Sequence, residues 1–341
     1  MAGELNSLLR ATSRSFFLTL RVLPGAIRPQ IGLAYLLART SDTIADTELV
    51  PLEQRLAALQ KVRERLLGQG TAPLNFGELA KQQGSPAEQA LLDKVEGSLA
   101  ALRKYRAEDQ KLIRDVLALI TGGQELDLRR FAGASAENVV ALETAAELDD
   151  YTYRVAGCVG EFWTKICRRH LFPHARLDEK QLIADGIRFG KGLQLVNISR
   201  DLPADLKKGR CYLPTQKLDA ARLLPETLLS PANEARFLPL YREYLDKAES
   251  HLVAGWTYTD TLPFGQFRVR LACAWPILIG VRTIEKLRAA NVIELQQRVK
   301  VSRAEVRAIM RHSVLACPFR KAWRNLLPSA GKAVASGGKL A

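Results

Sequence analysis

The sequence predicts an all-α protein. Apolar residues recur at helical spacing in nearly every segment between turns, and runs of alternating β-branched residues, which would indicate strands, are missing. The 341 residues are 47% hydrophobic, which is typical of a globular protein, and no linker rich in Gly, Ser and Pro interrupts the middle of the chain. We therefore expect one helical domain over residues 1–318 and a basic, disordered tail over residues 319–341.

The expected helices follow one another between turn signals. Gly68 and Pro73 mark one turn, and residues 81–86, which end in Gly-Ser-Pro, mark another. The predicted helices cover residues 31–46, 52–67, 88–104, 107–131, 137–160, 179–202, 231–257 and 264–290.

A polar stripe follows one face of the helix predicted from residue 179 onward. Gln194, Asn197, Asp201 and Asp205 are spaced by three, four and four residues, so they share a face, while the positions between them are mainly apolar. Two carboxylates one turn apart repel each other, and near the interior they are costly unless a cation binds them. Mg²⁺ is the candidate, because it takes few protein carboxylates together with waters and phosphate oxygens. For this stripe alone, a solvated acidic face remains the alternative.

A second stripe of the same kind lies near the N-terminus. Tyr35, Arg39, Asp42 and Asp46 are spaced by four, three and four residues. Two helices that each carry an aspartate pair beside an arginine can hold a metal–diphosphate cluster between them. The repetition therefore favours such a clamp over two unrelated acidic faces.

Four motifs resemble, in the same order, those of the squalene/phytoene synthases, which join two prenyl diphosphates head to head. The matching segments are residues 13–16 (Ser-Arg-Ser-Phe), 39–46, 151 with 155–160, and 194–214. The resemblance implies a single-domain helical bundle of the isoprenoid-synthase type around a central cavity, open at the end where the aspartates lie.

The resemblance also implies roles for the polar residues. The ligands of Mg²⁺ would be Asp42, Asp46, Asp201 and Asp205. Arg39 and Arg200 would act as catalytic residues that stabilise the departing diphosphate, because a guanidinium stays charged and presents a fork of donors. The substrate-binding residues would be Ser13, Arg14, Ser15, Phe16, Tyr35, Gln194, Asn197 and Arg210. Ordinary surface ion pairing is the alternative for the arginines.

Tyr151 occupies the position of the family's catalytic tyrosine. Such a residue would stabilise an allylic carbocation and pass a proton towards the released diphosphate, whereas a packed core tyrosine is the alternative. Small residues are expected to leave room for a prenyl tail between helices: Ala156, Gly157, Gly160, Gly190 and Gly192. Gln124 and Asp127 lie in a further matching segment and are expected to touch the substrate.

Two positions depart from the family's pattern in the second aspartate motif. Ala204 stands where the family usually has an acidic residue. Pro203 disfavours helical geometry at Leu202 and removes a helix hydrogen bond, so we expect a kink that moves Asp205 relative to Asp201.

The last third of the chain resembles squalene synthases in residues 273–276 and 291–303, although Ala272 replaces the aromatic residue that those enzymes place before the first run. The second run borders the nicotinamide cofactor in those enzymes. It therefore implies that Asn291, Lys300 and Arg303 bind NADPH, while a solvated basic face is an equally good account.

On this basis we expect a squalene synthase. Two molecules of farnesyl diphosphate would condense through presqualene diphosphate, and NADPH would reduce the intermediate to squalene. Dehydrosqualene or phytoene synthase, which use no NADPH, is the first alternative. A non-catalytic scaffold is a further alternative, kept open by Pro203 and Ala204, and a class I terpene cyclase would use one aspartate-rich helix rather than two paired motifs.

The net charge of +14 indicates anionic partners, but the basic residues are interspersed with acidic ones and no nucleic-acid recognition motif occurs. Five scattered cysteines indicate reduced thiols in a cytoplasmic protein. No apolar run approaches the ~20 residues that span a bilayer, so we expect no transmembrane segment. Peripheral contact with the inner face of the membrane is left open.

Overall fold

The computed structural model describes residues 2–13, 16–83, 85–294 and 298–327. Most of these residues are helical. The strands among them are β1 (Val140–Ala141) and β2 (Arg210–Cys211), which pair in parallel over two residues each. The predicted all-α class is therefore confirmed. None of the helices in these ranges is long and apolar enough to cross a bilayer.

The internal contacts divide the chain into two compact units. The first comprises Met1–Ala132 and Phe162–Pro173, and the second comprises Gly133–Glu161 and His174–Ala341. A unit defined by contacts is not by itself a domain that folds alone. The single domain expected over residues 1–318 therefore stays a prediction.

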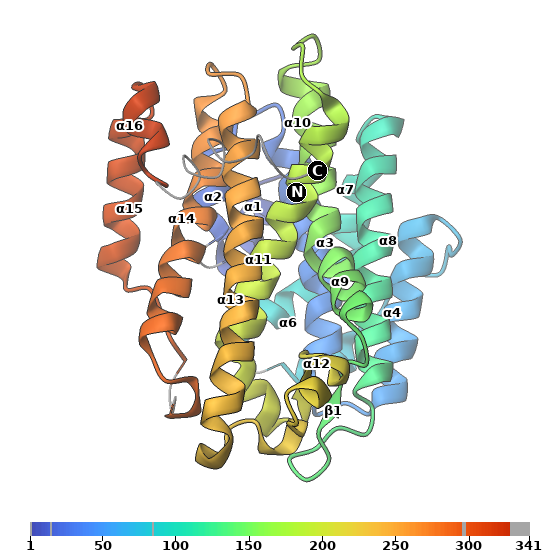
Figure 1. Ribbon diagram of the computed structural model, residues 1–341. Helices are drawn as coiled ribbons and strands as arrows, with labels where there is room; N and C mark the ends of the chain where they lie inside the picture. Colours follow the sequence, from blue (N-terminus) through green and yellow to red (C-terminus); the bar gives the residue numbers. More distant parts are fainter. Residues whose placement is uncertain (1, 14–15, 84, 295–297, 328–341) are drawn as a thin grey trace. The chain divides into compact units, whose positions relative to one another are not determined.

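The first unit is built on α3 (Arg28–Asp46) and α8 (Ala107–Arg130), which pack against each other, and α4 (Leu52–Leu67) packs on both (Figure 1). Pro29 lies in the first turn of α3, where its missing N–H is no loss. A left-handed Gly68 with φ of 75° ends α4. The other helices of this unit are α1 (Ala2–Thr12), α2 (Phe16–Val22), α5 (Gly77–Lys81), α6 (Pro86–Asp93) and α7 (Val95–Leu102).

The second unit is built on three long helices, α11 (Glu179–Lys207), α13 (Glu234–Thr261) and α14 (Phe267–Ala289), which pack side by side (Figure 1). Shorter elements complete it: α9 (Ala145–Thr152), a π-helical turn (Tyr153–Gly157), the start of α10 (Cys158–Leu171), α12 (Thr215–Ala220), 3₁₀ turns at Pro225–Thr227, Pro231–Asn233 and Val292–Glu294, α15 (Arg303–Ala316) and α16 (Arg320–Arg324).

Glycines bring the π-helical turn and the start of α10 into direct backbone contact with α11. A Cβ on Gly160 would lie 1.9 Å from the carbonyl oxygen of Gly186, and one on Gly190 would lie 2.2 Å from that of Ala156. For Gly160 and Gly190, the expectation that they leave room for a prenyl tail is therefore wrong. The missing side chains let two backbones approach each other, and that contact fills the space.

Helix α11 continues through Pro203 to Lys207. The expected end near Leu202 is therefore wrong, and both Asp201 and Asp205 lie on one helix. Pro203 has no N–H to give to the carbonyl of Ser199, four residues earlier. The hydroxyl of Tyr241 on α13 donates to that carbonyl instead, at 3.0 Å. A tertiary hydrogen bond thus replaces the missing helical one.

The folded part of the chain extends past the predicted boundary at residue 318. Residues 320–324 form α16, and Trp323 is fully buried, with its ring stacked on Trp256 at 5.2 Å. The boundary was placed too early because a buried tryptophan, rather than helical periodicity, holds this short segment. The remainder of the predicted tail, residues 328–341, lies outside the described residues.

Candidate active site

The first unit holds one half of the predicted site, on α3. The Arg39 guanidinium lies 2.5 Å from Oε1 of Glu88 on α6 and 3.8 Å from Oδ2 of Asp42. Burial alone would lower the pKa of Arg39, but the two carboxylates outweigh it and raise the pKa above its usual value. Arg39 is therefore a permanently charged donor beside the first aspartate pair.

Asp42 occupies an environment that disfavours its charged form. Burial raises its pKa to about 6 and the Asp46 carboxylate adds to the rise, although Arg39 and Gln124 act in the opposite direction. The side-chain amide of Gln124, from α8, donates to Oδ1 of Asp42. Oε1 of Gln124 is buried without a hydrogen-bond partner. We call Arg39, Asp42, Glu88 and Gln124 the first-unit cluster.

The predicted entrance segment is only partly described. The Ser13 side chain is 2% exposed and its hydroxyl donates to the carbonyl of Leu9 in its own helical turn. The Tyr35 hydroxyl donates to the carbonyl of Thr12 at 3.2 Å, so it ties α3 to α1. Arg14 and Ser15, together with the side chain of Phe16, lie outside the described residues.

The second unit brings together Tyr151 and the polar stripe of α11. The Tyr151 side chain is largely buried, and its ring stacks on Tyr212 with centroids 4.7 Å apart. The amide of Gln194 donates to the Tyr151 hydroxyl at 3.4 Å, and the amide of Asn197 donates to Gln194 at 3.4 Å. The two amides therefore form a chain of hydrogen bonds that runs from Asn197 through Gln194 to the phenol oxygen of Tyr151.

Asp201 is engaged by two guanidinium groups. Arg200 binds both of its oxygens, at 3.0 and 2.9 Å, and Arg298 binds Oδ2. Burial would raise the pKa of Asp201, but the hydrogen bonds from both arginines outweigh it and hold the pKa below its usual range. We call Tyr151, Gln194, Asn197, Arg200 and Asp201 the second-unit cluster.

The end of the second motif is shaped by its turn. Gly209 has φ of 74°, and a Cβ there would lie 2.2 Å from the carbonyl oxygen of Ser135, so only glycine fits. This turn places Arg210 on β2, opposite Val140 of β1. Asp205 and Arg210 are both partly exposed.

The two aspartate pairs differ in how well they suit a divalent cation. In the first-unit cluster, a carboxylate with a raised pKa and the unpartnered oxygen of Gln124 are hard oxygen ligands of the kind that Mg²⁺ prefers. In the second-unit cluster, Arg200 and Arg298 already neutralise Asp201. The described residues contain no group of three or more His, Cys, Asp or Glu side chains arranged to hold a metal ion.

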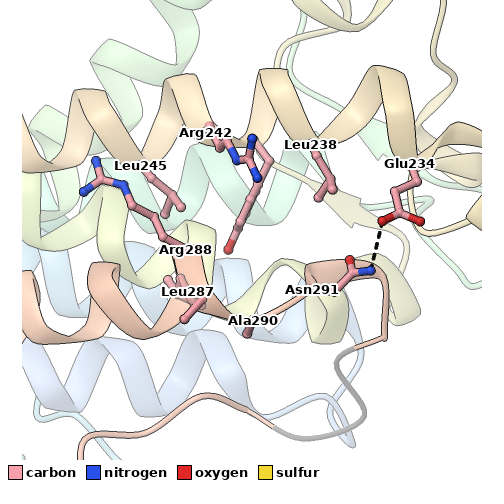
Figure 2. Close-up of a pocket in the computed structure, with 10 residues that line it drawn as sticks. Glu234, Leu238, Arg242, Leu245, Leu287, Arg288, Ala290 and Asn291 are labelled. Carbon is pink, nitrogen blue, oxygen red and sulfur yellow. Dashed lines mark hydrogen bonds between the residues drawn. The ribbon is translucent and has the colours of Figure 1, made fainter.

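Of the three residues expected to bind NADPH, Asn291 lines a cavity that Lys300 and Arg303 do not line. Asn291 lines a cavity of about 210 Å³ with Arg242 and Arg288, and its amide donates to Glu234 at 3.2 Å (Figure 2). Arg288 is itself paired with Asp246 and Glu249 (not drawn in Figure 2). This volume is below that of most ligand sites, so the cavity does not enclose a dinucleotide.

Lys300 and Arg303 do not line this cavity. The backbone carbonyl of Lys300 accepts a hydrogen bond from Lys286, and Arg303 is the exposed first residue of α15.

Three residues that contact the predicted site were missed in the sequence. They are Glu88, Tyr212 and Arg298. Each contacts its partner from a separate element, so helical spacing gave no signal for Glu88 or Arg298. Tyr212 lies within the matching segment 194–214, which was the available hint.

The family model for squalene/phytoene synthases matches residues 9–305, which contain both clusters. The chain belongs to this family. The roles of the residues in the two clusters do not follow from membership alone.

The chain is similar to curated relatives of two activities. A bifunctional lycopene cyclase/phytoene synthase of Gibberella fujikuroi is 29% identical over 283 residues, covering 80% of this chain and 46% of that protein. The squalene synthase of Saccharomyces cerevisiae is 27% identical over 251 residues, covering 74% of this chain and 54% of that protein. The chain thus spans about half the length of the curated relatives it matches.

A solved structure confirms the predicted fold. TcSQS, in complex with the ligand BPH1237, matches 99% of this chain and 93% of its own chain with a TM-score of 0.77 at 21% identity. At this identity the likeness shows the fold alone.

Proposed function

We propose that the protein is a Mg²⁺-dependent squalene synthase that condenses two molecules of farnesyl diphosphate head to head through presqualene diphosphate and then reduces the intermediate with NADPH. The observation that carries the coupling step is the repeated arginine–aspartate motif, on α3 and again on α11, in a chain of this family. The last third, from residue 273 to residue 303, supports the reductive step through its resemblance to squalene synthases.

The arginines would assist the first bond cleavage. The carbon–oxygen bond of one substrate breaks and the diphosphate leaves with the electron pair. Arg39 and Arg200 are each partly buried beside an aspartate, where a charged donor acts on an anion more strongly than in water. Arg210 would hold a second diphosphate.

Tyr151 would serve the carbocation and its proton. Gln194 donates to the phenol oxygen, which is therefore an acceptor in that bond. The buried stack with Tyr212 keeps water from one face of the ring. The double bond of the second substrate attacks the cation, and the proton lost on ring closure would pass by way of Tyr151 to the released diphosphate.

Asp42 and Asp46, with Asp201 and Asp205, would hold Mg²⁺, which supplies charge neutralisation for the diphosphates when bound. The raised pKa of Asp42 beside Asp46 supports a cation at the first pair, whereas Asp201 would have to exchange an arginine for the ion. For NADPH the fit is incomplete, since Lys300 and Arg303 do not line the cavity that Asn291 lines, and no step is assigned to the cofactor.

A second candidate is dehydrosqualene or phytoene synthase. It is favoured by the similarity to bifunctional lycopene cyclase/phytoene synthases such as that of Gibberella fujikuroi. A non-catalytic scaffold would keep the fold without the chemistry. Mg²⁺-dependent thermal stabilisation by a farnesyl thiodiphosphate separates a scaffold, which should show none, from either enzyme.

The test is one incubation of purified protein with farnesyl diphosphate and Mg²⁺, with and without NADPH, followed by mass analysis of the hydrocarbons. Squalene only with NADPH, and the cyclopropyl alcohol after phosphatase treatment without it, is the expected result. Dehydrosqualene regardless of NADPH, or turnover only with geranylgeranyl diphosphate, would replace the proposal by the second candidate.

We further propose that the protein works in the cytoplasm at the inner face of the membrane.

A further inference from the structure

Large apolar side chains lie exposed on two neighbouring segments of the second unit. They are Phe264 (43% exposed), Phe267 (53%), Val314 (49%), Leu315 (64%) and Phe319 (65%). We call these five residues the exposed apolar surface. They come from the turn between α13 and α14, the first residue of α14, the last turn of α15 and the residue before α16.

Contacts between α16 and the α13–α14 turn join the two segments. The Arg320 guanidinium lies 5.6 Å from the centre of the Phe264 ring, and Phe319 directly precedes it in the chain. Nε of Arg324 lies 3.0 Å from Oδ2 of Asp260, near the end of α13. The apolar side chains therefore belong to one continuous end of this unit, where α15 and α16 lie beside α14 (Figure 1).

Buried tryptophans fix the backbone beneath this surface. Trp323 is fully buried against Trp256, and the Arg270 guanidinium lies over its ring at 4.9 Å. Nε1 of Trp275 on α14 donates to the hydroxyl of Ser313 on α15 at 2.9 Å. The exposed residues are thus held outward by a rigid support rather than displaced from a core.

The charge around the exposed apolar surface is mainly positive. Residues 261–284 and 306–327 contain no Asp or Glu. The nearby Asp260 is paired with Arg270 and Arg324. The cations of these segments are Arg268, Arg270, Arg282, Arg307, Arg311, Arg320, Lys321 and Arg324. Of these, Arg270 is buried, and Arg282 is paired with Glu285 and Glu305. Exposed aromatic and aliphatic side chains among cations are typical of a surface that contacts anionic lipid headgroups.

We propose that the exposed apolar surface docks the protein onto an anionic lipid bilayer. The phenylalanines and Leu315 enter the boundary between headgroups and acyl chains, while Arg311 and Lys321 contact lipid phosphates. Nucleic acid would satisfy the cations but give no reason for aliphatic side chains at 49% and 64% exposure. The inference deepens the proposed membrane location and rests on the proposed function for its purpose, because a hydrocarbon product partitions into lipid.

The test is cosedimentation of the full chain with vesicles of phosphatidylcholine, with and without phosphatidylglycerol. The wild type should bind the anionic vesicles, bind neutral ones weakly, and lose binding as salt is raised. Leu315→Ser with Phe319→Ser should weaken binding by about tenfold or more. Arg311→Gln with Lys321→Gln should weaken binding to anionic vesicles alone.

Matched controls change the same chemistry elsewhere. Leu49→Ser alters an apolar side chain that is 78% exposed in the first unit, and Arg176→Gln with Lys180→Gln removes two exposed cations from the second. Both should bind vesicles like the wild type. Turnover of detergent-dispersed substrate should be unchanged in every one of these variants, so vesicle binding without turnover would count against the proposed function and not against docking.

Three results would overturn the docking proposal. One is equal vesicle binding by the wild type and the Leu315/Phe319 variant. Another is an equal loss in the Leu49 control. The third is a wild type that does not bind vesicles but self-associates, as measured by light scattering, while the Leu315/Phe319 variant does not self-associate. That result would assign the surface to a second copy of the chain.

Discussion

The hydrogen bond between Tyr241 and Ser199 provides a sharp test of how α11 carries its aspartates through Pro203. Replacing Tyr241 with Phe removes only the hydroxyl that donates to the Ser199 carbonyl at 3.0 Å. Tyr241 is 3% exposed, so water does not readily take its place. An unsatisfied buried carbonyl costs about 1–3 kcal/mol, and we expect Tyr241→Phe to lower the free energy of unfolding by that amount.

Pro203→Ala supplies the control that isolates this cause. Alanine restores a backbone N–H that can bond to the Ser199 carbonyl within the helix. In the Pro203→Ala background, the loss of unfolding free energy caused by Tyr241→Phe should therefore be smaller by at least about 1 kcal/mol than in the wild type. Urea unfolding of the four proteins, followed by circular dichroism, gives this coupling energy directly.

Tyr244 offers a matched comparison on the same helix. It is 7% exposed, and Tyr244→Phe makes the same chemical change away from Ser199. Its effect should be the same with Pro203 or with Ala at that position. A coupling energy for Tyr241 and Pro203 within ~0.3 kcal/mol of zero would refute the account.

Three further predictions concern the two clusters and the backbone contact beside them. Because the pKa of Asp42 is raised to about 6, its favourable contribution to folding is present below its ordinary pKa of 3.8 and is lost as pH rises through 6. Asp42→Asn should therefore raise the melting temperature of the ligand-free protein at pH 8 but not at pH 3.5. The Asp42 side chain is 45% exposed and solvent screens its charge, so we predict only the direction of this change. Equal shifts at both pH values would contradict it. Tyr151→Phe should reduce turnover far more than diphosphate affinity, since the ring and its stack remain; equal losses in kinetics and in calorimetric binding would make Tyr151 a packing residue. Gly160→Ala should lower the free energy of unfolding by at least about 1–3 kcal/mol, because its Cβ would lie 1.9 Å from the Gly186 carbonyl oxygen. In the same thermal unfolding assay, Gly97→Ala on α7 should stabilise the protein, because the new Cβ meets no atom within 4 Å.

Helices whose ends are set by neighbouring residues in the sequence were predicted correctly. The helix over residues 52–67 was predicted with both ends correct, because Pro51 precedes its first turn and Gly68 supplies the left-handed end. The segment predicted as one helix over residues 137–160 was wrong in its first part. There, β1 pairs with β2, about seventy residues later, and Thr144 caps α9 by accepting from the N–H of Glu147 at 3.2 Å. Pairing at that separation leaves no mark on helical periodicity.

The candidate site shows the same division. Both polar stripes were predicted from spacing, because residues three and four apart share a helix face. Their partners come from other elements: Glu88 from α6, Gln124 from α8 and Arg298 from beyond α14. Only the fold brings Glu88 to Arg39, Gln124 to Asp42 and Arg298 to Asp201. That the two aspartate pairs face each other across one metal cluster stays a prediction.

The most direct test of the central claim is to measure, in the presence of Mg²⁺, how fast the Asp42→Asn and Asp201→Asn variants release diphosphate from farnesyl diphosphate. The circular dichroism of each variant is recorded as a control for folding. Asp93→Asn and Asp219→Asn, which change exposed aspartates in the first and second unit, are the matched controls. We expect both cluster variants to lose release by at least about a thousandfold with unchanged helical signal, while both controls keep it. Near-normal release from either cluster variant would contradict the assignment of the active site to these two helices.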